Sequence, residues 1–111
     1  MATKIYEGKY TNSSDQLYLV ENGKIYKGKY SNSSDLIREV KPEGIKIENS
    51  KVYKGKYTYS SDQIMLIEGN KIFKGKYSNS SDQIALIDGD RLADSDFEKI
   101  VYLLAQRNNL I

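Results

Sequence analysis

Residues 71–90, KIFKGKYSNSSDQIALIDGD, are the clearest copy of a unit that recurs along this chain and determines its fold. Related copies begin at Lys4 (KIYEGKYTNSSDQLYLVENG), Lys24 (KIYKGKYSNSSD) and Lys51 (KVYKGKYTYSSDQIMLIEGN). A fixed period of this kind indicates one supersecondary unit used repeatedly. We therefore expect a single domain over residues 1–111, built from repeats at about 4–23, 24–50, 51–70 and 71–90.

Each copy contains two short runs that are typical of β-strands. In the last copy these are residues 71–77 and 83–87, which are rich in Ile, Phe, Tyr and Leu and are bounded by SNSSD and DGD. Asn22-Gly23 and Gly69-Asn70 tolerate positive φ and suit two-residue hairpin turns. The sequence predicts a mainly β fold, an antiparallel meander of four hairpins that forms a curled sheet or a barrel; a β-solenoid is the alternative.

The hairpin turn at Asn22-Gly23 sets a register for the strands. It places Glu21 opposite Lys24 and Val20 opposite Ile25. Side-chain alternation then puts the Tyr-x-Gly-x-Tyr spacing on one face, which we expect to form the core together with the leucines of the neighbouring strand. The glycines are expected to mark curvature or close backbone approach inside a strand. The residues predicted to share this face are Leu17, Leu19, Tyr26, Gly28 and Tyr30, with equivalents that begin at Tyr6, Tyr53 and Phe73.

The regular spacing is broken once, between the second and third copies. The Gly-Lys-Tyr triplets begin at Gly8, Gly28, Gly55 and Gly75, so the middle step is seven residues longer than the other two. Pro42 and Gly44 punctuate this region. We assign the insertion to residues 41–47, with a bend after Val40 and a resumed strand at 45–47. A functional excursion and a tolerated surface loop remain equal alternatives.

After Gly89 the hydrophobic period changes from two to about 3.6. Phe97, Ile100, Val101 and Leu104 then share one face, which predicts an amphipathic helix at about residues 95–108. Ser95 and Glu98 have the spacing of a capping box. Because this helix has an apolar stripe and the sheet has an apolar face, we expect the two to pack together.

Composition excludes several classes of protein. Hydrophobic residues make up 39% and charged residues 29% of the chain, there is no stretch long enough to cross a bilayer, and the formal charge is +2. The chain has no His and no Cys, so a Ser-His-Asp triad, a thiol nucleophile, a disulfide and a thiolate or imidazole metal site cannot be assembled from it. We predict a protein that is not an enzyme and that has no cofactor or metal. The repeat begins almost at the first residue, which leaves no room for a signal peptide and favours the cytoplasm.

Two sets of polar residues are candidates for binding. The SNSSD loops, with their hydroxyls, amides and carboxylates, could contact a carbohydrate or a hard cation, although such residues also form compact turns by hydrogen bonding to nearby backbone. Exposed tyrosines, for which Tyr18 and Tyr59 are the examples, would assist them. The candidate ligand loops contain Asn12, Ser14, Asp15, Asn32, Asp35, Tyr59, Asp62, Asn79 and Asp82.

The second set is a series of lysines at matching outward positions, with Glu7 as the exception. On adjacent strands they would form a positively charged ribbon able to contact nucleic-acid phosphates or an acidic polysaccharide. Outward lysines also serve solubility and discourage association of sheet edges, which is the plainer explanation. The set comprises Lys9, Lys27, Lys29, Lys54, Lys56, Lys74 and Lys76.

The motifs IYKGKYSNSSD and IDGDRLADSDFEKIVYLL resemble a group of short bacterial proteins built from tandem I-Y-x-G-x-Y-S-x-S-S-D units and closed by a helix. The resemblance covers nearly the whole chain and implies a bacterial origin and a repetitive β fold, but it transfers no site residues. A looser similarity to choline-binding repeats fails because those repeats build ligand cages from tryptophan, which is absent here.

These observations favour a non-enzymatic binding, interaction or structural repeat protein. Binding of a carbohydrate or cell-envelope polymer through the SNSSD loops and tyrosines is the first alternative, and binding of nucleic acid or another polyanion through the lysines is the second. Another protein or a polysaccharide is the expected partner, nucleic acid is disfavoured, and no oligomeric state is predicted.

Overall fold

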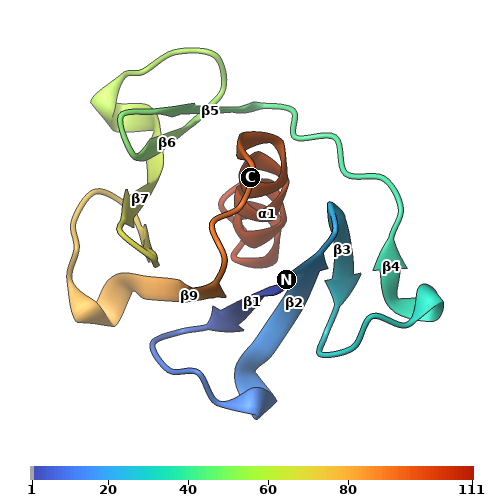
Figure 1. The fold of residues 1–111 in the computed structure, drawn as a ribbon. Helices are drawn as coiled ribbons and strands as arrows, with labels where there is room; N and C mark the ends of the chain where they lie inside the picture. The colour runs from blue at the N-terminus through green and yellow to red at the C-terminus, as the bar shows by residue number, and fades with distance from the viewer. Residues whose placement is uncertain (1) are drawn as a thin grey trace.

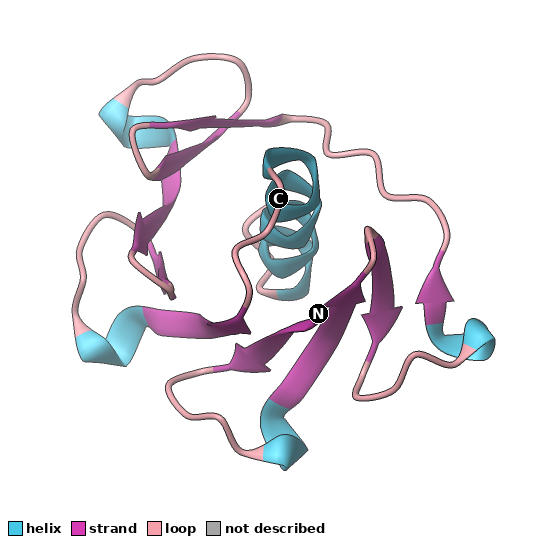
Figure 2. Ribbon diagram, viewed as in Figure 1, coloured by secondary structure: helices cyan, strands magenta, loops and turns pink. Residues whose placement is uncertain are grey.

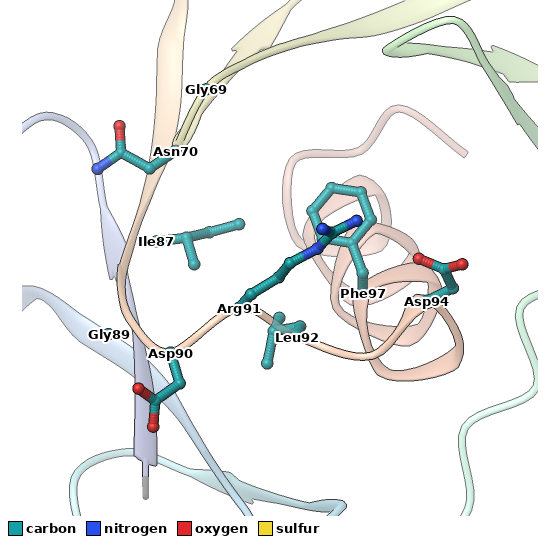
Figure 3. A pocket seen from close by; sticks show the side chains of 9 residues that line it. All are labelled: Gly69, Asn70, Ile87, Gly89, Asp90, Arg91, Leu92, Asp94 and Phe97. Atoms are coloured by element: carbon teal, nitrogen blue, oxygen red, sulfur yellow. The ribbon is translucent and has the colours of Figure 1, made fainter.

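A computed structural model describes residues 2–111, which form a mainly β domain with one long helix (Figures 1 and 2). The strands are β1 (Ala2–Glu7), β2 (Gln16–Glu21), β3 (Lys24–Lys27), β4 (Leu36–Ile37), β5 (Ile45–Glu48), β6 (Lys51–Lys54), β7 (Gln63–Glu68), β8 (Lys71–Lys74) and β9 (Gln83–Gly89). Helix α1 spans Asp94–Arg107, and each SNSSD loop contains a short 3₁₀ turn (Ser13–Asp15, Ser33–Asp35, Ser60–Asp62, Ser80–Asp82). Among the described helices, none has the length and apolar character needed to cross a membrane.

The strands form one antiparallel sheet in the order β4-β3-β2-β1-β9-β8-β7-β6-β5. The first and last strands pair with each other, with Ile5 opposite Ile87. The sheet curls around α1, which lies inside the ring of strands, and it stays open between β4 and β5 (Figure 1). The predicted antiparallel meander is confirmed, as a curled open sheet rather than a closed barrel or a solenoid.

The predicted hairpin turns are also confirmed. Asn22 and Gly23 have φ values of 54° and 74°, and they place Glu21 opposite Lys24 and Val20 opposite Ile25. Gly69 and Asn70 join β7 to β8, with Gly69 at a φ of 61° and Glu68 opposite Lys71. A third two-residue turn joins β5 to β6 through Asn49 and Ser50, whose φ values are 51° and 63°.

The core lies between the inner face of the sheet and α1. Ile5, Ile25, Val52 and Ile72, one from each repeat, belong to the same buried cluster as the helix residues Ile100, Val101, Leu104 and Ala105. The amphipathic helix is therefore confirmed. The predicted capping box is wrong, because the N-cap residue is Ala93 and no side chain caps the helix; the first helical bond joins the N–H of Phe97 to the carbonyl of Ala93 at 2.9 Å.

The prediction that the Tyr-x-Gly-x-Tyr face forms the core around the helix is wrong. The first aromatic of each group (Tyr6, Tyr26, Tyr53, Phe73) is buried, but alternation places it on the outer face, opposite the neighbouring Ile or Val that contacts the helix side. The loops lie on that outer side of the ring (Figure 2). The second aromatic of each group is 61–68% exposed.

The glycines explain why the two aromatics differ. Gly8, Gly28, Gly55 and Gly75 have φ values between 80° and 92°, and a Cβ on any of them would meet no atom within 4 Å. They are glycines because of this left-handed conformation and not because of close approach. Each one ends a strand and begins a loop, so the alternation of faces does not continue to the tyrosine two residues later.

The inserted residues are 38–44 instead of the predicted 41–47. Leu36, Ile37 and residues 45–51 match residues 16–24 of the first repeat, so β4 and β5 are two halves of one strand separated by seven residues. The strand predicted at 45–47 is confirmed. The first half ends at Ile37, before the predicted bend at Val40, and each half keeps a different neighbour: β4 pairs with β3, and β5 pairs with β6.

Candidate functional site: four equivalent loops

The four loops, residues 8–15, 28–35, 55–62 and 75–82, extend from the same end of the sheet. Each follows one strand of a repeat and precedes its antiparallel partner, whereas the two-residue turns lie at the opposite end. We refer to these as the loop end and the turn end. Helix α1 begins after β9 at the turn end and runs back, so its last turn reaches the loop end, where Arg107 contacts Glu7 at 2.9 Å.

Hydrogen bonds between repeats hold neighbouring loops in fixed positions. The N–H of Gly8 donates to the carbonyl of Ile84 at 3.0 Å, and the side chain of Gln83 donates to the carbonyl of Gly8 at 3.0 Å. Gly75 receives an equivalent bond from Gln63 at 3.2 Å. Adjacent loops are two strands apart, which corresponds to about 10 Å along the sheet.

Each loop closes through backbone atoms. The N–H groups of Asp15, Asp35, Asp62 and Asp82 donate to the carbonyls three residues earlier, at 2.9–3.0 Å. The expectation that side chains make these turns is therefore wrong for the bond that closes them. Because the accepting group is the backbone carbonyl of the residue at this position, Tyr59 can replace the Asn found at positions 12, 32 and 79 without changing the turn. The φ and ψ angles of Tyr59 match those of the three asparagines.

The exposed large hydrophobic side chains of the loops are tyrosines. Tyr10, Tyr30, Tyr57 and Tyr77 are 67%, 66%, 61% and 68% exposed. The third loop adds Tyr59, which is also 61% exposed, with its ring stacked on Tyr57 at a centroid distance of 5.4 Å and an interplanar angle of 28°. The third loop thus presents a pair of aromatic rings, and the other three present one ring each.

Tyr18, which the sequence suggested as an exposed tyrosine, lies elsewhere. It is half-buried and packs against the core cluster on the inner face. This burial raises the pKa of its phenol above the ordinary value of 10.0, and the nearby Arg107 guanidinium opposes the effect in part. Tyr18 is therefore not available as a surface platform.

The polar candidates gather at the loop end, one set in each loop. Asn12, Ser14, Asn32 and Asn79 are exposed, and Asp15, Asp35, Asp62 and Asp82 are half-buried. Each loop contributes a single carboxylate, and over residues 2–111 no cluster of three or more acidic side chains could hold a metal ion. The arrangement suits hydrogen bonding to a neutral ligand better than coordination of a cation.

The candidate lysines also gather at the loop end, but in two rows instead of one ribbon. Lys27, Lys54 and Lys74 end their strands, where alternation places them on the inner face, and Lys9, Lys29, Lys56 and Lys76 lie in the loops. All seven are exposed. In the first repeat Glu7 replaces the strand-end lysine and pairs with Arg107. Each loop lysine directly precedes an exposed tyrosine.

Comparison with protein-family models, with curated proteins and with solved structures found no match for this chain.

Proposed function

We propose that this protein is a non-enzymatic binding module that holds an extended carbohydrate polymer at its loop end. The observation that supports the proposal is the exposure of the same tyrosine in all four loops. Burial of one aromatic side chain stabilises a fold by about 1.5–3 kcal/mol, and this chain leaves four equivalent rings outside while it buries the aromatic four residues before each of them. Amphipathic rings of this kind are well suited to stacking on the apolar face of a sugar.

The repetition favours a polymer over a single small molecule. Equivalent rings recur on loops whose strands lie about 10 Å apart along the sheet, so a chain-like ligand could contact several loops at once. Simultaneous contacts of this kind raise the overall affinity without any single strong site. The asparagine and serine side chains beside each ring supply donors and acceptors for sugar hydroxyls.

Single-stranded nucleic acid is the second candidate, because a lysine precedes the exposed tyrosine in every loop. Cations and stacking rings together are the elements of non-specific single-strand binding. We prefer the carbohydrate because each loop lysine is offset by an aspartate in the same loop (Asp15, Asp35, Asp62 and Asp82). Strong weakening by salt would identify the nucleic-acid mode.

Affinity electrophoresis through a panel of soluble polysaccharides tests the proposal. Replacing Tyr10, Tyr30, Tyr57 and Tyr77 together by Ala should weaken binding at least tenfold, whereas Tyr26→Phe, which alters a buried ring, should leave it unchanged. Tyr59→Asn is a matched change, because it converts KYTYSSD of the third loop to the KYTNSSD of the first. It should preserve the fold and weaken binding by a smaller factor. Unaltered binding by the fourfold variant, or binding of no polysaccharide, would refute the proposal.

A further inference from the structure

The opening between β4 and β5 has the properties of a second binding surface, independent of the loop tyrosines. We call it the seam; residues 38–44 cross it. β4 and β5 are the two ends of the sheet order, so each has one edge without a strand partner in the described part of the chain. In the β5–β6 pair, the N–H of Gly55 donates to Gly44 at 2.7 Å. Because hydrogen-bonded and non-hydrogen-bonded pairs alternate, the N–H groups of Ile45 and Ile47 point toward the seam.

Three hollows follow the seam and all share Ile37. The first, of about 210 Å³, lies between β3 and Lys99 of the helix. The second, of about 520 Å³, lies between Leu17 and the last turns of the helix, and the third, of about 400 Å³, lies under the inserted residues. Val40 and Leu103 contribute further apolar lining. The hollows have mixed polar and apolar linings from β2, β3, β4, the inserted residues and α1, and the free backbone edge of β5 lies on the other side of the seam.

The charged side chains that line the first two hollows are all positive. Lys24, Arg38 and Lys99 line the first hollow, and Lys27 and Arg107 line the second. Among the described residues that line these two hollows there is no carboxylate. Arg107 is paired with Glu7, which leaves the other cations to set the local potential. The third hollow is mixed, and there Lys41 and Glu39 form their own exposed ion pair at 2.9 Å.

We propose that the seam binds an extended acidic segment of a partner protein, about six residues long, which adds to β5 as a further strand. The free N–H groups select a peptide backbone, as in other cases of strand addition. Ile37, Val40 and Leu103 can contact apolar side chains at every second position, and the cations that line the hollows select acidic residues between them. An acidic polysaccharide or a nucleic acid would satisfy the cations but would not form hydrogen bonds with the strand edge as a peptide backbone does.

The test uses the full chain and a fluorescein-labelled synthetic peptide, Glu-Ile-Glu-Val-Glu-Ile-Glu, in fluorescence anisotropy. We expect saturable binding that falls with salt, and weaker binding of a peptide in which the same residues are reordered as Glu-Glu-Ile-Val-Ile-Glu-Glu. Arg38→Glu combined with Lys99→Glu should reduce affinity at least tenfold. Lys56→Glu combined with Lys76→Glu makes the same charge change away from the seam and should have little effect.

Amide hydrogen exchange supplies a readout that charge alone does not affect. The peptide should slow exchange at Ile45 and Ile47, whose N–H groups face the seam, more than at Lys46, which already pairs with Tyr53. Binding without this protection would overturn strand addition. Equal competition by a single-stranded oligonucleotide at the seam would overturn the peptide as occupant, and so would protection of Ile45 and Ile47 in a dimer formed without peptide. The tyrosine variants that test polysaccharide binding should leave both the peptide affinity and the protection of Ile45 and Ile47 unchanged, so the two proposals can fail independently.

Discussion

At the residue scale, the repeated glycines control where each strand stops. Gly28 has a φ of 89°, and its N–H makes the last bond to the neighbouring strand, with the carbonyl of Leu17 at 2.8 Å. A side chain at this position would meet no neighbour within 4 Å, so the backbone alone selects glycine. Gly89 is different, because a Cβ there would lie 2.5 Å from the carbonyl oxygen of Ala2.

Gly28→Ala should therefore destabilise the domain by about 1–2 kcal/mol, the penalty of a left-handed conformation for a residue with a Cβ. The midpoint of urea unfolding measures it. Lys29→Ala, at the next and exposed position, is the control and should change stability by less than about 0.5 kcal/mol. Equal midpoints for the two variants would show that the loop readily adopts another conformation.

Burial of Tyr18 should make the stability of the domain fall at high pH. Burial favours the neutral phenol in the folded state, so the pKa is raised and the unfolded chain loses this proton first. Its contribution is complete below the ordinary pKa of 10.0 and is lost as pH rises through the raised value. In urea unfolding between about pH 9 and 12, the stability of the natural chain should fall more steeply than that of Tyr18→Phe. Parallel curves would contradict the predicted burial effect.

The residues that the sequence misassigned are the tyrosines, and the physical reason lies in the glycines. Side-chain alternation does not continue through Gly28 to Tyr30, because the glycine ends the strand by taking positive φ. The sequence does not reveal that Tyr26 faces outward, because Ile25 and Tyr26 are both apolar and both buried. Tyr59, by contrast, could be predicted, since it replaces a polar loop residue.

At the element scale, α1 takes the place of an opposing sheet. Its buried residues Ile100, Val101 and Leu104 are fully shielded, and they meet one aliphatic residue from each repeat. The concave face of the curled sheet carries apolar side chains that must be buried, and the 14-residue helix α1 covers them. The period of 3.6 predicted this helix and its face well because long, strongly periodic segments depend on few local details.

Leu104→Ala should destabilise the domain by about 2–5 kcal/mol, because it leaves a cavity between helix and sheet. Leu104→Asp should be worse, since it buries an unpaired charge. Glu98→Ala, on the exposed side of the same helix, is the matched control. Thermal unfolding followed by circular dichroism measures all three, and an unchanged transition for Leu104→Ala would mean that α1 is dispensable for the stability of the sheet.

At the scale of the whole molecule, the first and last strands pair with each other, and the sheet opens between β4 and β5, which lie near the middle of the sequence. The pairing of β1 with β9 joins the copies that are most distant in sequence; it is the contact that the barrel alternative implies, but the repeats alone do not choose between a barrel and an open sheet. The opening could be located only roughly. The longer step between Gly28 and Gly55 revealed an insertion, but its bounds depended on recognising that Leu36-Ile37 and residues 45–51 together match residues 16–24.

Deletion of residues 38–44 should therefore close the domain. It restores the 20-residue step that separates the other copies and joins Ile37 to Ile45, so β4 and β5 become one strand that can pair with β3 and β6 at once. The added strand pairing should raise the urea midpoint and slow amide exchange at Ile45 and Ile47 without any ligand. The same variant should bind polysaccharide normally at its loops while losing the acidic peptide at the seam. A lower midpoint, or rapid exchange at those two amides, would mean that the seven residues do more than hold one strand apart.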